Sequence, residues 1–411
     1  MNVPVKRPAP SRVRPFAKTQ QATPKLKRLL LGRDLAPTPL EYERVCVALW
    51  QGDPAMDALV DWMFEYGPKQ ARALIMQALN EGYGSIPDCP EPIKAFFKPL
   101  DNPPSWVDWD LINDGVRFIH ASGEAATYVL RDLALMGGYL LSGFNQSLVM
   151  TGALNNGTQR RVAETGKWWI DCTEPDGLRR FGAGFKSTIH VRLIHALVRR
   201  SLAANPDWDE EEWGMPLSQV DMVATYLGFS VVMLGGLKLL GVLATPRESK
   251  GVLHLWSYAC WLMGVDKEWL VESEAAGAVL LHHTIMTQSK ANWTTRELAT
   301  ALAAEPKQRS YERFESARRF LAYHQHLSVS QYFLGTEKMV QLGLPAHVTP
   351  WFPLVTTPPR MISYLGHRAL PVLRRVQEKR GRKAQHDTLL SMFGSGEQGV
   401  IQPSKDHPAH I

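Results

Sequence analysis

The sequence contains little cysteine and none of the common nucleotide-binding or hydrolase motifs. Four cysteines occur among 411 residues, far apart and without CxxC or zinc-type spacing, so a disulfide framework and a structural zinc site have no support. There is no Walker A loop, no GxGxxG after a strand, no GxSxG and no kinase motif set. The sequence therefore gives no support for a nucleotide-binding enzyme. A reducing compartment suits the unpaired cysteines, which are Cys46, Cys89, Cys172 and Cys260.

Patterns typical of β-strands are also scarce. Instead, apolar residues recur every three or four positions, which is the spacing of an amphipathic helix. With 45% hydrophobic and 21% charged residues, the composition is that of a globular protein. The sequence therefore predicts an all-α fold. The segments with helical periodicity are 38–64, 69–80, 109–121, 127–142, 178–201, 217–241, 251–263, 268–288 and 310–334.

The net charge of +6 comes from two short stretches and not from the body of the chain. Residues 1–28 hold eight basic residues and no acid, and residues 374–383 hold six basic residues against Glu378. Without these stretches, 32 basic and 39 acidic residues remain, so the body carries a net charge of −7. A nucleic-acid enzyme needs its positive footprint on the folded surface, which argues against that class.

Both ends of the chain are predicted to be tails around one folded domain at residues 38–370. Residues 1–28 are basic and proline-rich and are predicted to be disordered, and residues 371–411 form a basic and then polar tail. The N-terminus lacks the apolar core of a secretory signal. These features predict a cytoplasmic protein, and the basic tails leave peripheral contact with a membrane open.

One segment, Met222 to Ala244, raises the question of a membrane span. It carries only Lys238 as a charged residue and is long enough to cross a bilayer. A helix packed on all sides inside a large helical protein is equally apolar. No short flanking loops with a clear Lys/Arg asymmetry accompany it. The buried core helix is the favoured interpretation, with a membrane segment as the alternative.

The stretch from Phe185 to Arg200 contains a candidate metal ligand. If it is helical, Arg192, His195 and Arg199 stand at i, i+3 and i+7, among apolar neighbours. A neutral histidine in such a helix suits the iron of a haem, and flanking arginines suit its propionates. The simpler alternative is a core histidine that only makes a hydrogen bond.

A second candidate lies upstream, where Arg161 and Thr165 stand at i and i+4. This spacing puts a cation and a hydroxyl on one helix face, so both side chains can point into one cavity. A solvated helix face would carry the same pair of residues.

Together these residues resemble the R-x-x-x-T and R-x-x-H-x-x-x-R motifs of the rubber oxygenases, or latex clearing proteins, and of the wider MpaB-type family. The resemblance covers about residues 40 to 370. It implies an all-α, globin-like domain that holds a non-covalent haem b with His195 as the axial ligand. It also implies that Arg161 and Thr165 stand on the distal side, and that Arg192 and Arg199 hold the propionates and brace the pocket.

The sequence departs from that family on the distal side. Rubber-cleaving members use a glutamate as base, but no glutamate closely precedes Arg161, where Asn145 and Gln146 stand instead. Glu164 is the first candidate for the base because it precedes Thr165 and lies one turn from Arg161. The resulting hypothesis is a haem-dependent oxygenase that oxidises a small lipophilic, possibly isoprenoid, alkene with dioxygen and not polymeric rubber.

Two other classes of function stay open. The acidic cluster from Asp207 to Glu212 resembles the magnesium-diphosphate sites of helical isoprenoid enzymes, although acids that open a helix give the same pattern. A membrane-associated lipid-binding protein is the other alternative. Two histidine pairs, His282-His283 and His324-x-His326, could also bind a metal, but adjacent or alternate residues diverge around a helix axis and no acid stands at ligand spacing.

Overall fold

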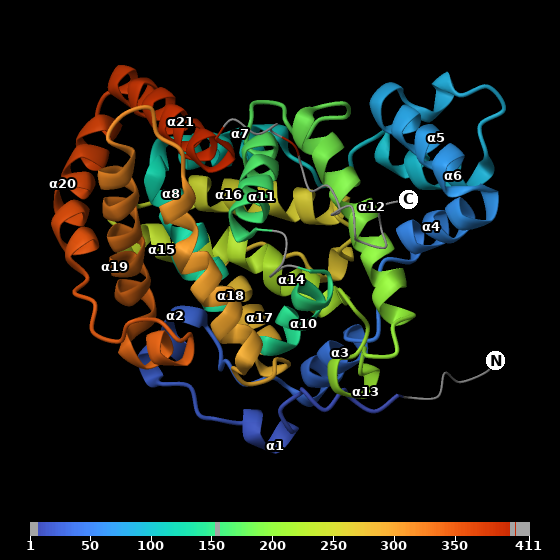
Figure 1. Cartoon of the computed structure of the whole chain (residues 1–411), viewed down its shortest axis with the longest axis horizontal. Coiled ribbons are helices and arrows are strands. Elements are labelled where there is room, and N and C mark those ends of the chain that lie inside the picture. The colour runs from blue at the N-terminus through green and yellow to red at the C-terminus, as the bar shows by residue number, and fades with distance from the viewer. Residues whose placement is uncertain (1–6, 153–156, 395–398, 400–411) are drawn as a thin grey trace.

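A computed structural model describes residues 7–152, 157–394 and 399. Over these residues the chain forms helices joined by loops and contains no strand, which confirms the prediction of an all-α fold. Figure 1 shows the helices packed in several layers, with α11, α14 and α16 near the centre. The longer elements are α3 (Pro39–Ala48), α4 (Pro54–Tyr66), α5 (Pro68–Glu81), α7 (Trp109–Ser122), α10 (Ser142–Met150), α11 (Thr158–Cys172), α12 (Ala183–Ala203), α14 (Gln219–Leu227), α15 (Met233–Leu239), α16 (Pro246–Leu262), α17 (Glu274–Met286), α18 (Trp293–Ala304), α19 (Glu315–Gln341), α20 (Trp351–Arg368) and α21 (Pro371–Phe393). Shorter helices are α1 (Phe16–Thr19), α2 (Lys25–Leu31), α6 (Glu91–Phe97), α8 (Glu124–Tyr128), α9 (Met136–Gly138) and α13 (Glu210–Trp213), and two π-helical segments are η3 (Val129–Leu135) and η4 (Gly228–Val232). The 3-10 turns are η1 (Tyr83–Ser85), η2 (Lys98–Leu100), η5 (Lys267–Trp269) and η6 (Glu305–Gln308).

Local sequence signals explain where several helices begin. Thr38 and Glu41 form a capping box at the start of α3, with Pro39 as the first helical residue. Thr245 and Glu248 do the same for α16. Each box satisfies backbone N–H groups that a helix start leaves unpaired.

Helices α16 and α7 pack closely against each other. The two helices approach so closely that a Cβ atom on Gly115 would lie 2.4 Å from the carbonyl carbon of Gly251. Glycine is therefore required at this crossing. Trp256 of α16 is almost completely buried and belongs to the large apolar core that surrounds the crossing.

The apolar segment questioned as a membrane span is interrupted in the structure. It forms α14, then η4, then α15. By length and composition, Gln219–Leu239 could cross a membrane, but 67% of its most apolar window is buried inside the protein. The burial is typical of a core helix.

The N-terminal prediction was wrong for the residues the structure describes. Residues 7–28 have defined positions, and Arg12 is buried with its Nη2 atom 2.9 Å from the Asp221 carboxylate. The indole of Trp50 donates to the carbonyl of Pro8 at 3.1 Å. These partners lie far along the chain, so composition alone did not reveal them. Residues 1–6 lie outside the described part.

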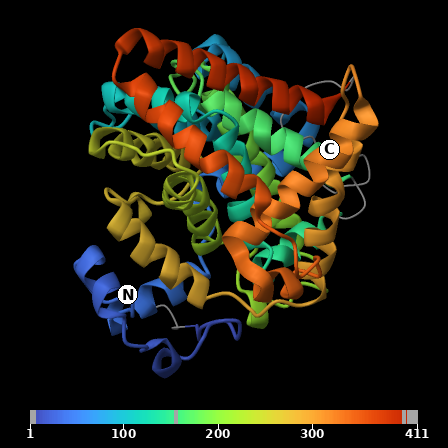
Figure 2. The same ribbon diagram turned by 90° about the vertical axis from the view of Figure 1, so that its left-hand side faces the viewer.

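The C-terminal boundary at residue 370 was also wrong, because residues 371–393 form α21. Its Arg382 is buried and donates to the carbonyl of Ile170 at 2.7 Å, and Gln385 donates to the carbonyl of Ile119 at 2.8 Å. Figures 1 and 2 show α21 lying across the body of the molecule. The folded domain therefore extends through α21. The predicted polar tail beyond it falls mostly outside the described residues.

His120 makes the stability of this region depend on pH. The ring lies between α7 and the end of α11, where Nε2 donates to the carbonyl of Thr173 at 2.7 Å. Burial, helped by nearby Arg382, lowers the pKa of His120 from 6.5 to about 4. Between these pH values the unfolded chain binds the extra proton, so the free energy of unfolding falls as the pH drops through 6.5 and has lost this contribution near pH 4.

We expect this term to amount to at most about 3 kcal/mol. Denaturant unfolding of the wild type and of His120→Gln at pH 7 and pH 4.5 measures it. The wild type should lose more stability than the variant on acidification. Equal losses would show that His120 does not carry the effect.

Candidate functional site

An apolar cavity of about 400 Å³ lies between the central helices. Its walls come from η3, α10, α11, α12, α14, η4, α16 and the end of α21. Arg161, Thr165 and His195 all line it. The structure therefore brings together three of the six residues predicted from sequence to form the site.

Two π-helical segments form neighbouring parts of the wall. Leu130 and Ala134 come from η3, and Phe229 comes from η4. The two segments pack against each other. π-helical turns are rare in proteins overall, but those that occur often lie at functional sites. Their presence here supports the assignment of this cavity as the site.

On α11, the predicted i, i+4 pair does point into one cavity. The hydroxyl of Thr165 donates to the carbonyl of Arg161 at 3.0 Å. The guanidinium of Arg161 has no hydrogen-bond or ion-pair partner among the described residues. A cation beside apolar walls attracts negative charge strongly because little water screens it.

On α12, His195 presents a neutral imidazole to the cavity. Burial, with the nearby charge of Arg199, lowers the pKa of His195 to about 4. Its Nδ1 atom is buried and has no hydrogen-bond partner within the described chain. A neutral imidazole is the form that binds a metal.

Arg192 and Arg199 do not reach the cavity, which corrects the prediction that they hold propionates. Arg192 donates from Nε and Nη2 to the two carboxylate oxygens of Asp53 at 2.5 and 2.7 Å. Arg199 donates to Asp57 at 2.5 Å and to the carbonyl of Leu217 at 3.3 Å. Both arginines therefore fix α12 to its surroundings, and the other half of the prediction, that they brace the pocket, stays a prediction.

Glu164 is not part of the cavity wall, which corrects its assignment as the base. Its carboxylate accepts a hydrogen bond from Nε of Arg160 at 3.0 Å on a neighbouring face of α11. Because the side chain is buried beside that arginine, it has no access to a substrate in the cavity. We expect Glu164→Gln to keep activity within a few-fold of the wild type, measured as oxygen uptake with a lipophilic alkene. Loss of activity with the fold intact would restore Glu164 as a candidate.

Sequence reasoning missed several polar residues of the wall, among them Tyr139 and Asp221. Burial raises the pKa of Tyr139, against the nearby charges of Arg161 and Arg131, so its phenol is neutral. Asp221 is held by Arg12 and also accepts from the hydroxyl of Ser218 at 2.9 Å. Neither residue stands at a spacing from Arg161 or His195 that marks it in the sequence.

One histidine of each predicted pair, and Asp209 of the acidic cluster, make hydrogen bonds within the fold. Nε2 of His283 lies 3.0 Å from the carbonyl of Leu35, and Nδ1 of His326 lies 2.6 Å from Asp132. No group of three or more potential ligands, counting His, Cys, Asp and Glu, is arranged to hold a metal ion in the described residues. In the acidic cluster, Asp209 caps α13 by accepting from the backbone N–H of Glu212. These residues lie outside the cavity.

Comparisons with known proteins identify relatives of this chain. Residues 124–361 match the family model described as ER-bound oxygenase mpaB/B'/Rubber oxygenase, catalytic domain. The rubber oxygenase of Streptomyces sp. (strain K30) is 22% identical over 225 residues. That match covers 54% of this chain and 54% of the relative, so the chain spans about half of the curated relative's length.

A solved structure shares the fold. The structure titled "Structure of Latex Clearing Protein LCP in the closed state" matches with a TM-score of 0.63 and 19% sequence identity. The match covers 87% of this chain and 94% of the other. At this identity the likeness concerns the fold alone. It covers more of the chain than the family model, which matches residues 124–361.

Proposed function

The chain belongs to the family of the ER-bound oxygenase mpaB/B' and rubber oxygenase catalytic domains, and from this premise we propose that it is a haem-dependent oxygenase. Its substrates would be dioxygen and a small lipophilic alkene. The observation that carries the proposal is the neutral, unpartnered imidazole of His195 in the wall of an apolar cavity that also holds Arg161.

The residues present fit a haem. His195 offers a nitrogen that needs no deprotonation before it binds iron. The walls are mainly apolar, and they include Trp168, Phe229 and Trp256, which suits the porphyrin ring. With Arg192 and Arg199 engaged elsewhere, Arg161 is the unpaired cation that lines the cavity in the described chain.

Bound haem would supply the iron chemistry that activates dioxygen. The protein's own residues would do the rest. His195 would hold the cofactor in place. Arg161 would stabilise negative charge that develops on the reacting oxygen, because a fixed cation in an apolar cavity needs no rearrangement to do so. Thr165 would add a hydroxyl on the same face of α11.

The apolar walls favour a lipophilic substrate. Burying apolar surface contributes about 25 cal/mol per Å², so a hydrocarbon chain gains more here than a sugar or a nucleotide. The side chain of Asn145, in the region where rubber-cleaving relatives carry a glutamate, donates instead to the carbonyl of Tyr139 at 2.8 Å. An amide held in this way cannot serve as a base, which supports a small alkene over polymeric rubber.

A visible absorption spectrum of the purified protein tests the proposal. Haem gives a strong Soret band, and a non-haem isoprenoid enzyme or a lipid-binding protein gives none. Oxygen uptake with a short isoprenoid alkene and with rubber latex then tests the substrate class. A protein purified with haem supplied during expression and still without a Soret band would rule the proposal out.

Arg161→Ala should retain haem and lose activity. Removing one preorganised charge-stabilising donor typically lowers kcat by about a hundredfold or more. Thr165→Ala should have a smaller effect because its hydroxyl is already bonded to the helix backbone. The measurements are the Soret absorbance per protein and the rate of oxygen uptake. If Arg161→Ala lost its haem completely, the residue would belong to cofactor retention and not to turnover.

A further inference from the structure

The outward face of α20 is apolar, which is the reverse of an ordinary surface helix. Figures 1 and 2 show α20 on the outside of the molecule, beside α19 and α21. Val355 and Ile362, two turns apart, are 67% and 70% exposed. Leu354 and Leu365 are also exposed, as are both prolines at 358 and 359. No charged side chain interrupts this stripe.

The charged residues of α20 point inward. Arg360 donates to the carbonyl of Leu240 at 3.2 Å. Arg368 donates to the carbonyl of Leu243 at 2.5 Å and to Glu248 at 2.8 Å.

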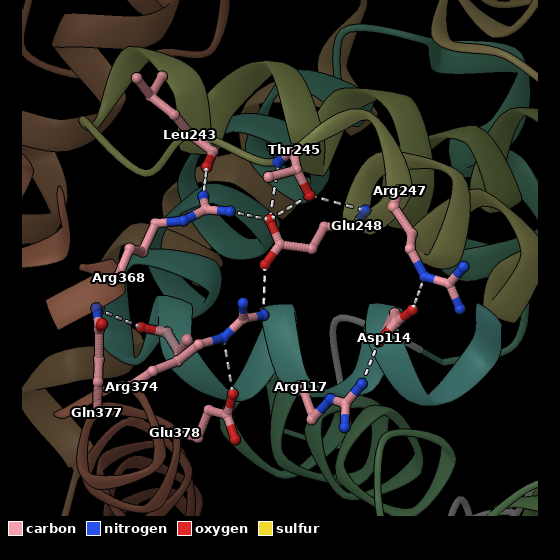
Figure 3. Close-up of polar contacts among 11 residues, drawn as sticks. Asp114, Arg117, Leu243, Thr245, Arg247, Glu248, Arg368, Arg374, Gln377 and Glu378 are labelled. Atoms are coloured by element: carbon pink, nitrogen blue, oxygen red, sulfur yellow. Dashed lines mark hydrogen bonds and ion pairs between the residues drawn. The ribbon is translucent and has the colours of Figure 1, made fainter. Parts of the chain in front are cut away.

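Glu248 fixes this orientation. Figure 3 shows its carboxylate between Arg368 of α20 and Arg374 of α21, and the structure buries it almost completely. Rotating α20 to hide its apolar stripe would leave Glu248 with one fewer cation in a buried position, which is costly. The ion pairs of Glu248 therefore keep the apolar stripe of α20 on the outside of the protein.

The apolar stripe continues into a basic rim. Leu370 and Val372, at the junction with α21, are 57% and 71% exposed. Beyond them, Arg375, Lys379 and Arg380 are exposed. The acid in this stretch, Glu378, is turned toward Arg374 at 3.2 Å.

A second element, α2, has the same character. All of its residues but the last, Leu31, are exposed. They combine leucines with three basic residues, which are Lys25, Lys27 and Arg28. Figure 1 places α2 on the left-hand side of the molecule, below α15 and α20.

We propose that the apolar stripe of α20 and its basic rim dock on the surface of an anionic lipid bilayer. Aliphatic side chains that enter the headgroup boundary, flanked by cations that meet anionic lipid, are the two components of interfacial binding. A second copy of the chain fits less well. In a two-fold dimer the same patch faces itself, so the basic rim would find no negative charge on the facing patch, whose acid, Glu378, is turned toward Arg374.

Co-sedimentation of the full chain with vesicles tests this, and it needs no cofactor or activity. The vesicles are phosphatidylcholine with and without phosphatidylserine. The variants are Val355→Glu/Ile362→Glu for the stripe and Arg375→Gln/Lys379→Gln/Arg380→Gln for the rim. The matched control is Leu40→Glu/Val47→Glu, which places the same two charges, also two turns apart, on exposed aliphatic residues of α3. Circular dichroism checks that each variant is folded.

We expect the wild type and Leu40→Glu/Val47→Glu to bind the phosphatidylserine vesicles, and added salt to weaken that binding. The stripe variant should bind about tenfold less or worse, and the rim variant should lose its preference for phosphatidylserine. Unchanged binding of the stripe variant would overturn the proposal and assign any lipid contact to other parts of the chain. A lipid-free dimer that the stripe variant dissociates would also overturn it, in favour of a second copy of the chain.

Discussion

His195→Ala is expected to abolish haem binding while the helical fold remains. The imidazole is the one side chain of the cavity wall for which the sequence motif, the neutral state and the missing partner coincide. An axial ligand is the strongest single bond between a protein and a non-covalent haem. Because the ring is uncharged and makes no hydrogen bond to the described residues, its removal should cost the fold little beyond lost packing. The Soret absorbance per protein should fall to background, with far-ultraviolet circular dichroism unchanged.

Exogenous imidazole provides the control for this variant. It can occupy the space that alanine leaves and replace the missing ligand, so adding it together with haem should restore part of the Soret band. Thr165→Ala, which shortens another side chain of the same cavity, should keep its haem. Full haem occupancy in His195→Ala would show that the iron is held elsewhere.

Arg192→Ala is expected to destabilise the protein by about 3–5 kcal/mol, because it leaves the carboxylate of Asp53 buried without its cation. The bidentate pair joins α12 to the start of α4, where Asp53 also caps the helix. A Cβ on Gly264 would lie 2.4 Å from Asp53 and 2.8 Å from Arg192. The surrounding backbone therefore leaves little room for rearrangement. Denaturant unfolding measures the change.

Arg200→Ala is the matched control on the same helix. Arg200 pairs with Asp61 of α4, but both side chains are largely exposed, and exposed pairs typically contribute at most about 1 kcal/mol. The double variant Arg192→Ala/Asp53→Asn should be more stable than the sum of its single changes predicts. Equal losses for Arg192→Ala and Arg200→Ala would mean that burial of the Asp53 pair has no energetic consequence.

Helical periodicity predicted the fold class and most of the central helices, because the buried face of an amphipathic helix appears in the sequence as apolar residues spaced three or four positions apart. The helices it missed include α18, α20 and α21. In α20, Pro358 and Pro359 stand inside the helix, where proline normally indicates a break. The basic residues of α21 make it look like a tail, although Arg382 is buried.

Only part of the site could be predicted from the sequence, because spacing along one helix shows which residues share a face and not what lies opposite that face. Spacing shows that Arg161 and Thr165 share a face of α11, and this was confirmed. Spacing does not show what the neighbouring elements offer to each face. Asp53 and Asp57 draw Arg192 and Arg199 away from the cavity, and Arg160 holds Glu164. Asp53 and Asp57 are distant in sequence and meet these arginines only in the folded chain. Arg160 is different, because its i, i+4 relation to Glu164 is visible in the sequence.

The π-helical segments η3 and η4 make the exact chain length a determinant of the cavity. A π turn holds one more residue than an α turn, so deleting one residue in 129–135 would let this segment rewind as an α-helix. The helix after it would stay close to its present orientation, but the side chains inside the segment would point in new directions. Arg131, which lines the cavity and donates to Glu305 at 3.0 Å, and Asp132, which meets His326, could not both keep their partners. A one-residue deletion that barely alters composition should therefore be more damaging here than many substitutions, and relatives that keep this cavity should keep the spacing across both segments.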